Sequence, residues 1–181
     1  KTNVTAVGWL ARACSEHRLT LVHVSSDYVF DGTSSSPYAE DAALSPLGVY
    51  GQTKAAADVI VATVPQHYIL RTSWVIGEGN NFVRTMASLA ERGIKPSVVN
   101  DQIGRLTFTQ DLAAGIQHLL STKPAFGTYN LSNEGPASSW ADIASAVFEL
   151  LGHSPTEITG VSTADYFAGK IGIAPRPFNS M

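Results

Sequence analysis

Helix-forming segments alternate with short apolar runs along this chain. Residues 4–17 carry apolar side chains at helical spacing, and residues 20–25 then form a run typical of a buried strand. Residues 50–64 and 67–71 repeat this order, and Pro65 closes the second helix. Strands joined through a helix pair in parallel, because the helix returns the chain to the starting edge of the sheet. The pattern therefore predicts an α/β fold in which helices cover both faces of a parallel sheet.

The second half of the chain continues the alternation with shorter elements. Thr109 is expected to cap a helix, since a threonine hydroxyl can accept a hydrogen bond from a free amide of the first turn. Gly93 and Gly152 stand where helices commonly end. The expected helices cover residues 82–92, 109–120, 140–151 and 164–168, and the expected strands cover residues 95–100, 127–131 and 157–159.

Three side chains near the first strand have the chemical types that carbonyl reduction by a hydride cofactor requires. Tyr50 and Lys54 are four residues apart on an expected helix, so both side chains lie on one face. A cation at that distance stabilises a phenolate and makes the phenol a better proton donor. Ser26 ends the apolar strand and supplies a hydroxyl that can hydrogen-bond a carbonyl oxygen. We therefore predict an oxidoreductase site built from Ser26, Tyr50 and Lys54.

Composition excludes several other kinds of protein. With 181 residues, 44% hydrophobic and 15% charged, the chain can form one globular core with an appended lobe. The net charge is −3 and no basic stripe is present, so no nucleic-acid partner is predicted. No apolar stretch is long enough to span a membrane, and the five histidines lack metal-ligand spacing. Cys14 stands alone, which fits a reducing cytoplasm.

Six segments of the chain carry a family resemblance: residues 24–32, 45–54, 70–75, 79–82, 98–102 and 175–180. In this order, along nearly the whole chain, they resemble the extended short-chain dehydrogenase/reductase superfamily and, within it, the dTDP-4-dehydrorhamnose reductase family. This resemblance implies the C-terminal portion of a Rossmann-like parallel sheet plus a smaller α/β substrate-binding lobe. It assigns residues 1–73 to the trailing part of the dinucleotide-binding domain and residues 74–181 mainly to the lobe.

The resemblance also implies roles around the reacting carbonyl. Tyr50 is expected to protonate the alkoxide, while Lys54 assists it and hydrogen-bonds the nicotinamide ribose. Ser26 is expected to polarise the keto oxygen. The backbone of Thr72 and Ser73 is expected to lie beside the nicotinamide.

Further residues are expected to hold the nucleotide sugar. Asp27 would hydrogen-bond a sugar hydroxyl, and Trp74, which follows a strand end, would pack on the deoxysugar ring. Asn80 and Asn81 stand at a helix N-terminus, where free amides favour the diphosphate, and Arg105 would balance its charge. Each of these residues has a structural alternative. Asp27 can form a turn, Trp74 can be core, the asparagines can cap a helix, and Arg105 can be a surface residue.

The beginning of the chain departs from the family pattern. Such reductases open with a strand, a glycine-rich turn and a helix that hold the cofactor pyrophosphate. Here no glycine-rich fingerprint precedes the helix over residues 4–17, and Gly77-Glu78-Gly79 lacks the third glycine. We therefore expect the chain to be the C-terminal part of a longer enzyme and to be inactive alone.

The expected reaction is the reduction of dTDP-4-dehydro-L-rhamnose to dTDP-L-rhamnose by NADPH or NADH. Some relatives use Mg²⁺ at a subunit interface, so Mg²⁺ and a homodimer stay open. A 4,6-dehydratase is disfavoured, because Tyr28 occupies the position at which dehydratases need a glutamate. A nucleotide-sugar epimerase remains an alternative. So does a non-catalytic subunit similar to the regulatory β subunit of methionine adenosyltransferase, which shares the pattern of residues 25–32.

Overall fold

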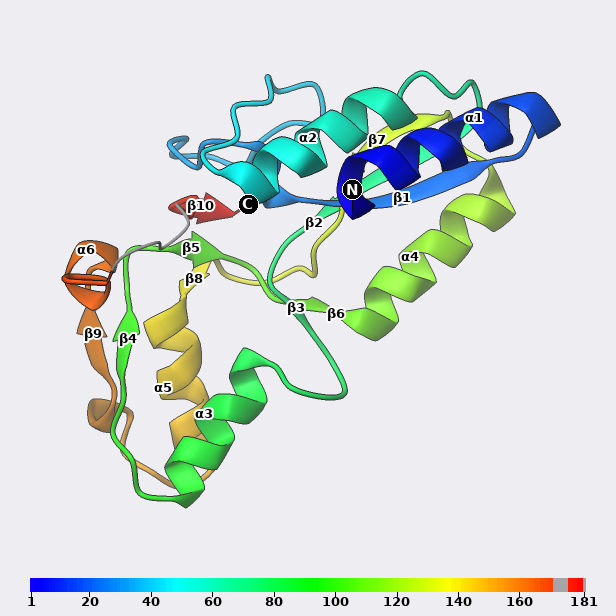
Figure 1. Ribbon diagram of the computed structural model, residues 1–181. Helices are drawn as coiled ribbons and strands as arrows, with labels where there is room; N and C mark the ends of the chain where they lie inside the picture. Colours follow the sequence, from blue (N-terminus) through cyan, green and yellow to red (C-terminus); the bar gives the residue numbers. More distant parts are fainter. Residues whose placement is uncertain (171–175, 181) are drawn as a thin grey trace.

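The computed structural model describes residues 1–170 and 176–180, which form a three-layered α/β unit and a smaller lobe (Figure 1). The main sheet contains β1 (Leu21–Ser26), β2 (His67–Thr72) and β7 (Gly127–Asn130) in the order β1-β2-β7. Both pairs of neighbouring strands are parallel. The predicted α/β fold with a parallel sheet is therefore confirmed.

Helices cover both faces of this sheet. A π-helical turn (Thr2–Ala6) leads into α1 (Val7–His17), which packs beside α2 (Val49–Val61) on one face, and α4 (Thr109–Thr122) covers the other. Successive side chains of β2 alternate between the two faces, as a strand requires. One face buries Ile69 with Val7, Ala57 and Val61, and the other buries Tyr68 and Leu70 with Leu119.

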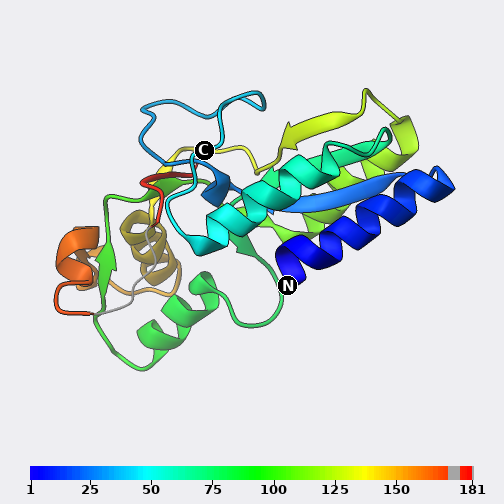
Figure 2. The same cartoon turned by 45° about the horizontal axis from the view of Figure 1, so that its top comes forward.

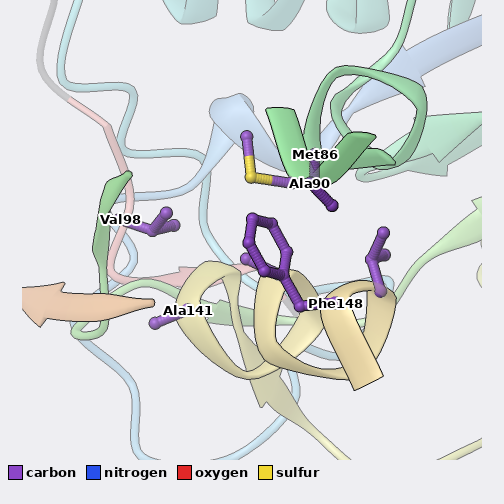
Figure 3. Close-up of a cluster of buried hydrophobic side chains, with 7 residues drawn as sticks. Met86, Ala90, Val98, Ala141 and Phe148 are labelled. Atoms are coloured by element: carbon purple, nitrogen blue, oxygen red, sulfur yellow. The ribbon is translucent and has the colours of Figure 1, made fainter. Parts of the chain in front are cut away.

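The smaller lobe has a core of its own. Its helices α3 (Phe82–Glu91) and α5 (Trp140–Leu150) pack against the parallel strands β4 (Ser97–Val99) and β9 (Thr159–Val161). Figure 3 shows the Phe148 ring pointing from α5 toward Met86, with the strand residue Val98 to one side; the Phe148 side chain is fully buried. The short helix α6 (Thr163–Tyr166) follows β9, and the turn over Pro155–Glu157 precedes it.

Several two-residue strands connect the lobe to the main sheet, as the turned view of Figure 2 also shows. These strands are β3 (Val75–Ile76), β5 (Ile103–Gly104), β6 (Thr107–Phe108), β8 (Ser138–Ser139) and β10 (Asn179–Ser180). β3 pairs in parallel with β6, while β5 lies between β10 and β8.

One sequence-based expectation, the cap of α4, differs from the structure. Thr109 is the first residue of α4 rather than its cap; Phe108 holds the cap position, and no side chain caps this helix. The division into residues 1–73 and 74–181 stays a prediction, but α4 and β7 pack on the main sheet although they lie beyond residue 74. Residue 175, in the last of the family-like segments, lies outside the described residues.

Candidate active site

A cavity of about 660 Å³ opens where β1 and β2 end. The carboxyl ends of parallel strands are where ligands of open α/β sheets gather. The predicted Ser26, Tyr50 and Lys54 all line this cavity, and so do Asp27 and Trp74. The remaining lining residues are Val24, Ser25, Tyr28, Thr72, Ser73, Val75, Gln102, Trp140, Arg176, Pro177 and Ser180.

Tyr50 is held by a close approach between α2 and the short 3-10 turn over Asp27–Val29. A Cβ atom on Gly51 would lie 2.1 Å from the Tyr28 carbonyl oxygen, so only glycine lets the helix come this near. The Tyr28 ring meets the Tyr50 ring edge-on, with 5.3 Å between the centroids. Tyr50 is 49% exposed, which leaves it accessible from the cavity.

Lys54 reaches across from α2 to the end of β1. Its Nζ donates a hydrogen bond of 2.5 Å to the Val24 carbonyl oxygen. Burial lowers the pKa of Lys54, and the negative charge of Asp58 acts in the opposite direction. The lysine therefore stands beside Tyr50 on the same helix face, with its ammonium fixed by the backbone of the strand.

Ser26 and Asp27 form a second polar pair in the cavity. The Ser26 hydroxyl donates to Asp27 Oδ1 at 2.8 Å and accepts from the Tyr28 backbone N–H at 3.3 Å. Burial raises the pKa of Asp27, while nearby hydroxyls of Ser180 and Ser26 lower it. Oδ2 of Asp27 is enclosed and makes no hydrogen bond of normal geometry with any described residue, although Ser180 stands close enough to affect its pKa. Asp27 can thus accept a further hydrogen bond from a ligand hydroxyl.

Trp74 both lines the cavity and packs on neighbours. Its indole stacks on that of Trp140, with 3.7 Å between the ring centroids and 16° between the planes. A Cβ on Gly104 would lie 2.8 Å from Trp74 Cε2, so this glycine allows the ring to sit close to β5. Trp74 has a φ of 47°, a left-handed conformation that is uncommon for a bulky residue and is found mainly at functional sites.

Three predicted ligand residues do not line this cavity. Asn81 caps α3 by accepting from the Arg84 N–H at 3.0 Å, and its side-chain amide donates to the Gly77 carbonyl at 2.7 Å. Asn80 borders a separate, smaller cavity on α3. Arg105 donates through Nε to the Gly135 carbonyl at 2.9 Å. Asn81 is thus best described as the cap of α3. A diphosphate contact of Asn80, Asn81 or Arg105 stays a prediction.

The cavity also contains residues for which no role was predicted. Arg176 and Ser180 come from the last family-like segment, and Gln102 from the segment before β5. Arg176 could have been identified from the sequence as a candidate site residue, because it is a cation within a family-like segment. Trp140 offered no such signal, because a tryptophan at the start of a helix is typical of a core residue.

A second cavity, of about 700 Å³, lies in the smaller lobe and shares Gln102, Trp140 and Arg176 with the first. Its walls are mainly apolar and aromatic, and Lys170 Nζ lies 4.3 Å from the centroid of the Tyr166 ring. The other lining residues are Phe82, Thr85, Met86, Leu89, Pro96, Ser97, Val98, Val99 and Phe167.

The described residues offer no ligand set for a metal: nowhere in 1–170 and 176–180 do three or more His, Cys, Asp or Glu side chains gather as metal ligands would. The option of Mg²⁺ is therefore not supported. Each helix in the same residues is too short or too polar to cross a lipid bilayer.

A parallel sheet with a cavity at the ends of its strands places the chain among the Rossmann-like α/β proteins. A family model described as the RmlD substrate binding domain matches residues 1–181, and the chain belongs to this family.

Curated relatives carry the reductase name. A dTDP-4-dehydrorhamnose reductase of Aggregatibacter actinomycetemcomitans is 39% identical over 98% of this chain, and one of Salmonella typhimurium is 40% identical over 98%. The chain spans 63% and 62% of the length of these two relatives. The predicted resemblance to dTDP-4-dehydrorhamnose reductases is confirmed.

Solved structures agree with this similarity. A dTDP-4-dehydrorhamnose reductase from Bacillus anthracis in complex with NADP is 35% identical, with a TM-score of 0.88; the match covers 98% of this chain and 62% of that one. A dTDP-glucose 4,6-dehydratase from the same species is 22% identical, with a TM-score of 0.77 over 89% of this chain and 55% of that one, and shares the fold.

Proposed function

We propose that this chain carries the catalytic and substrate-binding residues of a reductase that converts dTDP-4-dehydro-L-rhamnose into dTDP-L-rhamnose. The observation that carries the proposal is the position of Ser26, Tyr50 and Lys54 on one cavity at the ends of β1 and β2. The relatives named above support the substrate class, and the NADP complex of the Bacillus anthracis reductase supports a nicotinamide cofactor.

The nicotinamide cofactor, when bound, supplies the hydride that reaches the keto carbon. Tyr50 then gives its phenolic proton to the oxygen, which becomes the hydroxyl of the product. The charge of Lys54 stabilises the phenolate that Tyr50 becomes. Ser26 donates a hydrogen bond to the same oxygen as negative charge develops on it. For this, the Ser26 hydroxyl must turn from Asp27 toward the substrate, and Asp27 then accepts from a sugar hydroxyl instead.

The two cavities, which share Gln102, Trp140 and Arg176, match the two parts of a nucleotide sugar. The cavity with Tyr50 would hold the keto sugar, and the aromatic cavity of the lobe would hold the nucleoside. The diphosphate lies between sugar and nucleoside in such a substrate. Arg176 lines both cavities, and a guanidinium binds phosphate oxygens in a bidentate manner. We therefore assign the diphosphate contact to Arg176 instead of Arg105.

The test is an assay of the complete gene product with dTDP-4-dehydro-6-deoxy-L-mannose and NADPH or NADH. We expect nicotinamide absorbance to fall only when the keto sugar is present, and dTDP-L-rhamnose to form in equal amount. Epimerisation of the sugar without net consumption of NADPH would favour the epimerase alternative. Absence of turnover together with tight binding of another protein subunit would favour a regulatory role.

A further inference from the structure

A buried group of charged side chains lies directly behind Lys54. Asp58 follows Lys54 by one turn of α2, and its side chain is 2% exposed. Arg71 of β2 donates through Nε to Asp58 Oδ2 at 3.0 Å. His23 of β1 places its Nε2 3.8 Å from Asp58 Oδ1. Tyr50, Lys54 and Asp58 thus follow one another at intervals of four residues along one helix face.

This group is not explained by stability alone. A buried ion pair contributes little net stability, because apolar residues of similar size often replace it without loss. The same part of α2 already buries the apolar Ala55, Ala57 and Val61. Asp58 Oδ1 and His23 Nε2 also make no hydrogen bond with any described residue, although buried polar atoms are normally paired. Such an arrangement is found where a charge acts on a neighbouring group.

Lys54 is the neighbouring group that needs a compensating charge. Burial lowers the pKa of Lys54, and Asp58 opposes that change. His23 does not neutralise Asp58, because burial and the charge of Lys54 lower the pKa of His23 and keep the ring neutral near pH 7. Arg71 fixes the carboxylate, since its guanidinium also donates to the Glu40 carbonyl at 2.9 Å.

We propose that Asp58 is a positioning residue of the reductase reaction, whose buried negative charge keeps Lys54 protonated beside Tyr50. This inference rests on the proposed function. Asp27 lines the first cavity, but its carboxyl group is hydrogen-bonded to Ser26. The titratable and charged groups around Lys54 are Tyr50 and Asp58 from α2, His23 from β1, Arg71 from β2, Asp27 and Tyr28 from the 3-10 turn, and Arg176 from the C-terminal segment.

The experiment compares pH profiles of kcat for variants of the complete gene product. The pH dependence of kcat reports groups in the substrate complex. In Asp58→Asn the pKa of Lys54 falls further, so Lys54 loses its proton at a lower pH. We expect the alkaline limb of the profile to move to lower pH by about one unit. This is the lower end of the pKa change that a nearby opposite charge causes. At the midpoint pH of the wild-type limb, a shift of about one unit lowers the protonated fraction from one half to about one eleventh. There kcat is then expected to fall about fivefold, and Asp58→Glu is expected to restore the profile.

Arg71→Gln is the matched control, because it breaks the same ion pair but leaves the charge of Asp58. Its alkaline limb is expected at the wild-type position or higher. The double variant Asp58→Asn/Arg71→Gln leaves no unpaired buried charge and tests the same shift if Asp58→Asn alone does not fold. The inference would be overturned if the alkaline limb stayed at the wild-type pH in Asp58→Asn and in the double variant. It would also be overturned if the limb moved to lower pH in Arg71→Gln. A wild-type protein without reductase activity would instead refute the proposed function.

Discussion

At the scale of single residues, the proposed reaction requires the Ser26 hydroxyl to exchange its hydrogen-bond partner. Ser26 has one hydroxyl proton, and in this structure that proton is given to Asp27. A keto oxygen and a sugar hydroxyl together can replace this contact, since the first accepts from Ser26 and the second donates to Asp27. A substrate with a hydroxyl near its carbonyl therefore suits this pair better than a simple ketone.

Tyr50 is the residue whose loss should affect chemistry most. In Tyr50→Phe the ring and its edge-on contact with Tyr28 remain, but the proton donor is gone. We expect kcat to fall by about 10²–10⁴, the usual contribution of a positioned general acid. Substrate affinity, measured by equilibrium binding, should stay close to wild type. Turnover within tenfold of the wild type would remove Tyr50 from the mechanism.

Trp74 should matter for both substrate binding and folding. In Trp74→Ala the cavity loses an aromatic wall, and the stack with Trp140 is broken. We expect KM to rise, and the free energy of unfolding to fall by at least the roughly 0.5–1.5 kcal/mol that an aromatic pair adds beyond its buried area. Trp140→Ala breaks the same stack and serves as the comparison for stability; Trp140 lines the cavity too, so its KM is not a control. A large loss of stability with an unchanged KM would show that Trp74 is only a core residue.

At the scale of helices and strands, the close approach at Gly51 is what brings α2 to the site. In Gly51→Ala the new methyl group would meet the backbone carbonyl of Tyr28, which cannot move aside as a flexible side chain can. We expect a lower melting temperature and a lower kcat, because the start of α2 must shift and take Tyr50 with it. Gly8→Ala on α1 is the control: its methyl group would meet nothing within 4 Å. There the substitution should stabilise the protein by roughly 0.5–1 kcal/mol. Equal effects of the two substitutions would contradict this explanation.

The sequence predicts the long elements well and the short ones poorly. The helical spacing of apolar residues extends over several turns in α1, α2, α3 and α5, and all four were expected close to their observed bounds. The two-residue strands, such as β3 and β6, are too short to show an alternating pattern, and they form because the lobe and the sheet meet there. The predicted cap of α4, Thr109, was wrong by one residue. Phe108 has the extended backbone of a cap and Thr109 is already helical, and the residue types alone do not reveal this difference.

In the candidate site, too, only the part that local sequence spacing determines was predictable. Ser26, Tyr50 and Lys54 were predictable because they belong to one strand–loop–helix segment, within which spacing determines geometry. Arg176 reaches the cavity from the far end of the chain, which only tertiary packing determines. Asn81 was ambiguous, because an asparagine before a helix suits both an anion contact and a cap, and here it forms the cap.

At the scale of the whole molecule, the first cavity lies at the ends of β1 and β2 and the second lies in the smaller lobe, so a nucleotide sugar that fills both would contact both parts. A ligand that binds only the folded state stabilises it according to its concentration relative to Kd. dTDP alone at about 100 times its Kd should therefore add about 2.7 kcal/mol. For a protein of this size or larger, that corresponds to an increase of several degrees in melting temperature.

Two arginines separate the competing assignments of the diphosphate contact. In Arg176→Ala the guanidinium shared by both cavities is lost, so the dTDP-dependent increase in melting temperature should shrink strongly. In Arg105→Ala the increase should stay, because that side chain binds the Gly135 carbonyl and lines neither cavity. The measurement is a thermal melt of the complete gene product with and without dTDP, with inorganic phosphate as a control for unspecific anion binding. If the dTDP-dependent increase in melting temperature were lost in Arg105→Ala but kept in Arg176→Ala, the diphosphate contact would belong to Arg105, as the sequence alone had indicated.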